Sequence, residues 1–134
     1  MKHILLIGIL SIFVNLNTQA QKIEFEKVSA KKFQALILED EDYLLIDVDS
    51  KNVFNQSRIE GSISAETSQI LYSILDTTPE NLPVLIYCTS GDRSLKACKL
   101  VKENYPHKVF DLKGGLESWE AKGFKILHKF NFSK

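Results

Sequence analysis

Short apolar runs alternate with segments of helical periodicity along most of this 134-residue chain, and no other feature constrains its fold as strongly. Buried parallel strands are nearly unbroken in apolar residues. Three runs have this character: YLLIDV (43–48), PVLIYC (83–88) and KVFDL (108–112). Helical stripes are predicted over residues 30–38, 68–75, 94–105 and 116–122, and residues 23–28 alternate as an edge strand does. This order predicts an open α/β parallel sheet with helices on both faces.

Residues 1–20 have the features of a signal peptide. Lys2 gives a positive start, residues 4–14 form an apolar run, and Ala20 is a small residue suited to cleavage. The run is shorter than the roughly 20 residues that a membrane-spanning helix needs. We therefore expect cleavage after Ala20, a single domain over residues 21–134, and a periplasmic or secreted protein with no membrane association after cleavage.

The charge balance favours neither nucleic acid nor membrane partners. The chain has 17 basic and 17 acidic residues, and loss of Lys2 with the signal peptide leaves a net charge of −1. Such a chain has no strong field to attract a polyanion. Its residues show no clustered metal-ligand spacing, and nothing in the sequence calls for a cofactor.

The chain has two cysteines, Cys88 and Cys98, and export would bring both into an oxidising compartment where disulfides form. If a helix begins near Arg93, Cys98 lies about 7.5 Å along its axis. Cys88 lies beyond the start of that helix, and disulfide Cα atoms are usually within about 6.8 Å of each other. We therefore expect Cys88 to be a free thiol and Cys98 to be a small packing residue.

The loop after Cys88 has the composition of an anion-binding turn. Its residues, which precede or begin the expected helix, are Thr89, Ser90, Gly91, Asp92 and Arg93. Gly91 permits backbone angles that other residues avoid, and such a turn can direct several N–H groups at one point. The helix dipole and Arg93 would both favour thiolate over thiol, and the thiolate is the nucleophile. The alternative is an inert cysteine that fills the end of a buried strand.

Three blocks of the sequence resemble the single-domain rhodanese family of sulfurtransferases. They are LLIDVDSKNVF (44–54) with SRIEGSI (57–63), VLIYCTSGDRSLKA (84–97) and VFDLKGGLESWEAKGF (109–124). Their order and separations are similar to those of the family across nearly the whole of residues 21–134. The resemblance implies a rhodanese-like fold, with structural roles for Asp47, Gly114, Gly115 and Trp119.

The resemblance also implies a persulfide mechanism. Cys88 would take sulfane sulfur from a donor such as thiosulfate or polysulfide and pass it to a thiol or cyanide. Backbone N–H groups from Thr89 to Arg93 would hold the persulfide, and no general base is needed if the thiolate is preformed. His107 and His128 lie outside the motif, and we expect both to be surface residues.

The first block departs from the family pattern, which leaves other functions open. Asp49 stands where the family usually has Arg, Val53 occupies a usually charged position, and Ser57 with Arg58 replaces a Gly-His pair. Arg58 could restore positive charge facing the loop and contact substrate, or lie in solvent. A sulfur-carrier or binding module with little turnover is therefore an alternative to an enzyme. Four residues between Cys88 and Arg93, and no second cysteine beside Cys88, disfavour phosphatase and redox roles.

Overall fold

The structure, a computed structural model, describes residues 24–39 and 42–129. Within these residues, five strands form one parallel sheet in the order β1-β6-β5-β2-β4. The strands are β1 (Glu26–Val28), β2 (Leu44–Asp47), β4 (Ile63–Ser64), β5 (Val84–Tyr87) and β6 (Val109–Leu112). The three apolar runs of the sequence form the three central strands, β6, β5 and β2. The signal peptide expected over residues 1–20 lies outside the described residues.

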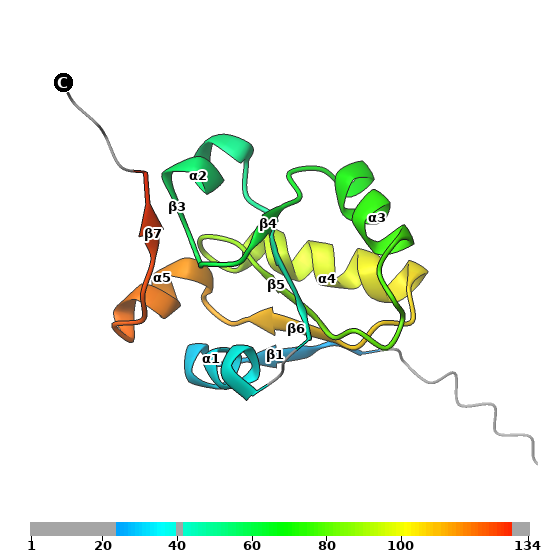
Figure 1. Ribbon diagram of the computed structural model, residues 1–134, viewed down its shortest axis with the longest axis horizontal. Helices are drawn as coiled ribbons and strands as arrows, with labels where there is room; N and C mark the ends of the chain where they lie inside the picture. The colour runs from blue at the N-terminus through cyan, green and yellow to red at the C-terminus, as the bar shows by residue number, and fades with distance from the viewer. Residues whose placement is uncertain (1–23, 40–41, 130–134) are drawn as a thin grey trace, which may run out of the picture.

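Helices cover both faces of this sheet, as the sequence predicts (Figure 1). One face carries α1 (Ala30–Glu39) and α5 (Gly115–Ala121), and the other carries α3 (Ser68–Asp76) and α4 (Asp92–Asn104). Three layers result, with a core on either side of the sheet.

Alternate residues of the central strands supply the two cores, which explains why these strands are almost entirely apolar, with Asp47 and Asp111 as the exceptions. Leu45 and Leu85 face the side of α1 and α5, whereas Ile46 and Ile86 face the side of α3 and α4. A strand that is buried on both faces has no solvent side on which to place polar residues. The register pairs Leu45 with Leu85 and Ile46 with Ile86 across β2 and β5, so each core is continuous along the sheet.

Local signals set the helix ends where the sequence placed them to within two residues. Ser29 accepts a hydrogen bond from the Lys32 N–H at 3.2 Å and so caps α1. Helix α4 ends at Asn104, two residues before Pro106, because proline has no N–H to donate to the helix. Trp119 is buried in the core beneath α5, in agreement with the structural role that the resemblance implies.

Besides the edge strand β4 (Ile63–Ser64), two short features have no counterpart in the sequence-based prediction. The first is a six-residue helix, α2 (Lys51–Gln56), which Ser50 caps by accepting from the Val53 N–H at 3.3 Å. The second is an antiparallel pair of two-residue strands, β3 (Ser57–Arg58) and β7 (Leu127–His128), which brings the end of the chain beside the segment that follows α2 (Figure 1).

The prediction that His107 is a surface residue is wrong. The side chain is 1% exposed, and its Nε2 lies 3.2 Å from the carbonyl oxygen of Thr78. Packing of the segment after α3 against the start of β6 buries the ring, and this contact joins residues far apart in the sequence. His128 is exposed, as expected.

The described helices are all too short or too polar to cross a membrane.

Candidate active site

Cys88 follows β5 directly and lies at the carboxyl edge of the parallel sheet, where such sheets bind ligands. Gly91 turns the chain into α4 with φ at +101°, a conformation that residues with a Cβ rarely adopt. The Cys88 side chain is only 1% exposed at the bottom of the loop. Both cysteines are free in the structure, in agreement with the sequence-based prediction.

Two backbone N–H groups point at the sulfur of Cys88. The N–H of Gly91 donates to Sγ at 3.1 Å, and the N–H of Ser94 donates to Sγ at 3.4 Å. The thiol in turn lies 3.6 Å from Ser94 Oγ, a hydroxyl that can rotate to donate to a sulfur anion. These donors lie at the start of α4, where the helix dipole also favours negative charge. The arrangement can therefore stabilise a thiolate or a persulfide anion.

The donors differ in part from those expected from the sequence, which were the N–H groups from Thr89 to Arg93. The N–H of Ser94 was not among the expected donors. Ser94 lies three residues after Gly91, which caps α4, so its N–H is one of the first in the helix and has no partner within the helix. The N–H of Thr89 points elsewhere: it donates to Asp49 Oδ1 at 3.2 Å, and the Thr89 hydroxyl donates to Asp49 Oδ2 at 3.0 Å. Asp49 is thus an anchor of the loop, a role that the sequence did not suggest.

Asp49 forms a buried pair with Asp47, and the two side chains are 5% and 0% exposed. Asp47 Oδ1 accepts the Asp49 N–H at 2.8 Å, which confirms its expected role as an acceptor for nearby backbone. Its second oxygen, Oδ2, has no hydrogen-bond partner among the described residues. Burial raises the pKa of Asp47 from its ordinary value of 3.8 to about 7, and the charge of Asp49 adds to the increase.

The first residues of α5 hold the loop from the other side. The N–H of Leu116 donates to the Cys88 carbonyl at 2.8 Å, and the N–H of Glu117 donates to the Thr89 carbonyl at 3.1 Å. A side chain at Gly115, whose φ is +60°, would overlap the carbonyl oxygens of Cys88 and Thr89. Gly115 is therefore required because the backbone of α5 packs directly against the active-site loop, whereas a side chain at Gly114, whose φ is +76°, would overlap Ser118 within α5.

The remaining predicted site residues are three exposed residues of the loop and Arg58, which comes from another segment. Ser90, Asp92 and Arg93 are exposed around its mouth. Arg58 lies on a different contact: its guanidinium is 4.8 Å from the centre of the Phe54 ring and donates to the Phe54 carbonyl at 3.3 Å. Arg58 makes no hydrogen bond to the loop within the described parts of the chain, so a substrate contact by Arg58 stays a prediction.

Cys98 and Asp111 are buried behind the loop, on the side of α4. Both side chains are 0% exposed, and burial raises the pKa of each. Cys98 is thereby kept as an unreactive thiol, and it packs in the core as expected. Residues 24–39 and 42–129 contain no cluster of three His, Cys, Asp or Glu side chains that could hold a metal ion.

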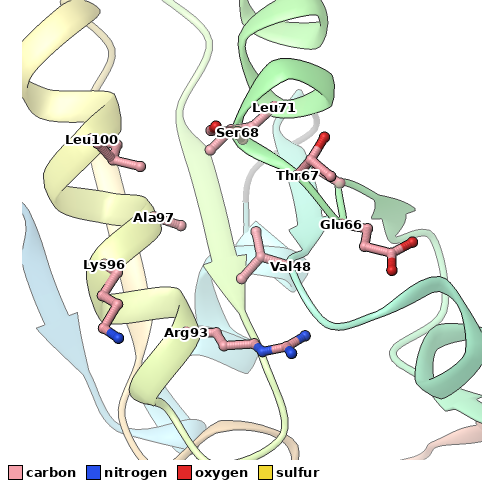
Figure 2. Close-up of a pocket in the computed structure, with 10 residues that line it drawn as sticks. Val48, Glu66, Thr67, Ser68, Leu71, Arg93, Lys96, Ala97 and Leu100 are labelled. Carbon is pink, nitrogen blue, oxygen red and sulfur yellow. The ribbon is translucent and has the colours of Figure 1, made fainter.

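A groove of about 380 Å³ begins beside the loop and runs between α3 and α4 (Figure 2). Its apolar lining consists of Val48, Ala65, Leu71, Ala97 and Leu100. Its polar lining consists of Glu66, Thr67, Ser68, Arg93 and Lys96. Arg93 is both a residue of the loop and a lining residue of the groove, so the groove opens at the edge of the sheet that carries Cys88.

The fold and the loop together are those of an α/β protein in which one cysteine is held among N–H donors at a strand-to-helix turn. The family model of the Rhodanese-like domain matches residues 29–122. This chain belongs to that family, as the resemblance of its three sequence blocks implies.

Relatives with known names agree with this membership. A sulfurtransferase of Allochromatium vinosum is 26% identical over 101 residues, which cover 75% of this chain and 94% of that protein. The thiosulfate sulfurtransferase GlpE of Pseudoalteromonas translucida is 26% identical over 85 residues, or 63% of this chain and 80% of that protein. At the level of the family, these relatives support a rhodanese-type transferase.

The crystal structure of a thiosulfate sulfurtransferase from Pseudomonas aeruginosa superposes with a TM-score of 0.72 and 18% sequence identity. The match covers 79% of this chain but only 21% of that chain, so this protein spans about a fifth of its length. At this identity the likeness supports the fold alone.

Proposed function

We propose that this protein transfers sulfane sulfur through a persulfide on Cys88. The observation that carries the proposal is the pair of N–H donors, from Gly91 and Ser94, that point at Cys88 Sγ. Donors fixed in this way stabilise charge on sulfur without reorganising during the reaction. The backbone of the loop is itself fixed by Asp49 and by the start of α5.

The first step loads sulfur onto the enzyme. The thiolate of Cys88 attacks the outer sulfur of thiosulfate, a new S–S bond forms, and the bond within thiosulfate breaks with its electron pair leaving on sulfite. A polysulfide reacts in the same way and leaves as a chain shorter by one sulfur. Neither reaction needs a general base if Cys88 attacks as a preformed thiolate.

The second step returns Cys88 to its starting state. A thiolate or cyanide attacks the outer sulfur of the persulfide, and the S–S bond to Cys88 breaks with its electron pair remaining on Sγ. The products are the acceptor persulfide or thiocyanate, with no net oxidation or reduction. Only four residues separate Cys88 from Arg93, and such a short loop suits a single sulfur atom better than a tetrahedral phosphate.

Two observations bear on the donor and on location. Asp49 adds a buried carboxylate next to the loop, which disfavours the doubly charged thiosulfate relative to a donor with less negative charge. The signal-peptide features of residues 1–20 support export, and we propose a periplasmic or secreted sulfurtransferase.

Steady-state turnover tests the proposal against the alternative of a sulfur-carrier or binding module. Thiosulfate or polysulfide is supplied with cyanide, and thiocyanate is measured for the protein, for Cys88→Ser and for Cys98→Ala as the matched control. We expect turnover in the protein and in Cys98→Ala, and none in Cys88→Ser. Loading of Cys88 without turnover would favour the carrier, and turnover in Cys88→Ser would refute the role of this cysteine.

A further inference from the structure

We propose that Asp111 is a positioning residue for Cys88 and that it acts through the hydroxyl of Ser94. As a neutral acid, Asp111 leaves the Ser94 hydroxyl to donate to the sulfur. As a carboxylate, it draws that hydroxyl away from the sulfur. The inference rests on the proposed function, because it concerns how negative charge on Cys88 is stabilised during sulfur transfer.

Asp111 lies behind the active-site loop, on the face of the sheet that α4 covers. Its strand neighbour Val109 belongs to the core cluster on this face, and residues two apart along a strand share a face. The register pairs Asp111 with Ile86 of β5, and Cys88 follows two residues after Ile86 in the same cluster. Asp111 is therefore one strand away from Cys88 and one step before it along the sheet, beneath the first turns of α4.

The carboxyl of Asp111 is a buried polar group without a partner. The side chain is 0% exposed, and neither oxygen makes a hydrogen bond with another of the described residues. Burial raises the pKa of Asp111, so the group keeps its proton above the ordinary range of a carboxyl. A neutral acid has one O–H to donate, and leaving it unused in the core costs free energy. The carboxyl therefore needs a polar neighbour.

Ser94 is that neighbour, and it connects the carboxyl to the sulfur. Its Oγ lies 3.6 Å from Cys88 Sγ, and its hydroxyl donates to the Gly91 carbonyl at 3.2 Å. The hydroxyl is also near enough to Asp111 to lower the pKa of that carboxyl against the effect of burial, although in the structure its proton points at Gly91. One hydroxyl proton thus has three acceptors within reach: the Gly91 carbonyl, the sulfur and Asp111.

The protonation state of Asp111 decides between these acceptors. A neutral Asp111 donates its own O–H to Ser94 Oγ, which leaves the Ser94 proton for the sulfur anion or the carbonyl. An ionised Asp111 competes with the sulfur for the Ser94 proton, because carboxylate oxygens are strong acceptors. It also places a negative charge behind the sulfur. Both effects disfavour a thiolate or a persulfide anion, so sulfur loading should slow as Asp111 ionises.

Lys27 is the charged group that faces Asp111 on the same side of the sheet. The two residues are paired in the register of β1 and β6, and the charge of Lys27 lowers the pKa of Asp111 against the effect of burial. The titratable groups that face Asp111 from α4 and from the end of β5 are Cys98 and Cys88. Burial raises the pKa of Cys98, and the charge of Asp111 raises it further, so Cys98 stays a neutral thiol. The remaining charged residues around this end of the sheet are exposed: Asp92, Arg93, Lys96, Lys99 and Lys113.

Two reactions of Cys88, followed against pH, test the proposal. The first is loading by thiosulfate in a single turnover. The second is alkylation by iodoacetamide, which needs a thiolate but no sulfur transfer. Both are measured by peptide mass spectrometry at Cys88, from about pH 6 to about pH 9.5, a range over which neither reagent changes its charge.

Four variants separate a positioning role from a structural one. Asp111→Asn keeps an amide that can donate to Ser94 but cannot ionise. Ser94→Ala removes the hydroxyl through which Asp111 acts. Lys27→Gln removes the charge that faces Asp111, and its matched control is Lys31→Gln, an exposed lysine of α1 on the other face of the sheet.

We expect both rates in the unchanged protein to rise with pH and then to fall about tenfold as Asp111 ionises. Asp111→Asn should show the rise without the fall, because the amide does not titrate. Ser94→Ala should be about tenfold slower before the fall and should show a smaller fall. Lys27→Gln should move the fall to higher pH, since the charge that lowers the pKa of Asp111 is absent, and Lys31→Gln should leave the fall in place.

No fall in the unchanged protein, or a fall of the same size in Asp111→Asn, would overturn the proposal. A fall of unchanged size in Ser94→Ala would also overturn it, because Asp111 would then act through its charge alone. If Asp111→Asn does not fold, Lys27→Gln decides, and an unshifted fall refutes the role of Asp111. Absence of thiosulfate loading, with the expected alkylation profiles, would refute the proposed function and support the positioning of Cys88 by Asp111.

Discussion

Replacing Asp47 by Asn tests whether Asp47, beside Asp49 under the active-site loop, is a buried carboxyl that titrates near neutrality. Asn keeps an oxygen that can accept the N–H of Asp49, as Asp47 Oδ1 does at 2.8 Å, but it has no charge. Asp47 is 0% exposed, and its Oδ2 has no partner among the described residues. The variant therefore removes a buried charge while retaining the hydrogen bond that positions Asp49.

The magnitude follows from the pKa of Asp47, which burial and the charge of Asp49 raise from 3.8 to about 7. Between these values the folded protein keeps a proton that the unfolded chain has released, so raising the pH destabilises the folded state. Each pKa unit corresponds to about 1.4 kcal/mol. The free energy of unfolding should therefore fall, through Asp47, by about 2 to 3 kcal/mol between about pH 5 and about pH 8.

Chemical denaturation at these two pH values measures the effect. The unchanged protein and Asp47→Asn share all other titrating groups, including Asp111, whose pKa burial also raises. The difference between their pH dependences therefore isolates Asp47. We expect the variant to lose about 2 to 3 kcal/mol less than the unchanged protein over this range. Parallel pH dependences would refute the description of Asp47 as a buried group that titrates near neutrality.

Three further predictions concern the loop and the second cysteine. Gly115→Ala should destabilise the protein in urea by about 3 kcal/mol, because the added Cβ overlaps the loop carbonyls, whereas Gly123→Ala, with open space around it, should lose only about 1 kcal/mol. Asp49→Ala should lower the free energy of unfolding by about 2 kcal/mol and slow persulfide loading, while Asp49→Asn, which keeps one acceptor, should lose less. Cys98, which is 0% exposed, should resist alkylation in the native protein, and labelling of Cys98 as fast as in urea-unfolded protein would contradict its burial.

The sequence predicts four of the five strands of the sheet and its four main helices because each has a strong local signal, whereas the two-residue strand β4 has none. The apolar runs can be recognised one strand at a time, and Ser29 and Pro106 mark helix ends through their own chemistry. The position of Cys88 at the edge of the sheet follows from the same pattern, since a cysteine that ends a buried parallel strand lies where that strand meets its loop.

The features that the sequence does not predict depend on contacts between distant residues. The pairing of β3 with β7 joins Arg58 to Leu127 through two-residue strands that have no periodicity to detect. The buried position of His107 depends on Thr78, and the anchoring of the loop depends on Asp49, which is 40 residues from its partner Thr89. A charged residue in place of the usual arginine gives no indication that it points inward and accepts hydrogen bonds.

The intact mass of the protein after treatment with a sulfur donor tests the central claim most directly. Residues 21–134 would be treated with thiosulfate and, separately, with polysulfide, beside a Cys88→Ser control. We expect a gain of one sulfur atom from at least one donor, absent from the control and removed by cyanide or a thiol. No gain from either donor in protein whose Cys88 is shown to be reduced, or an equal gain in Cys88→Ser, would contradict the claim that Cys88 carries the sulfur.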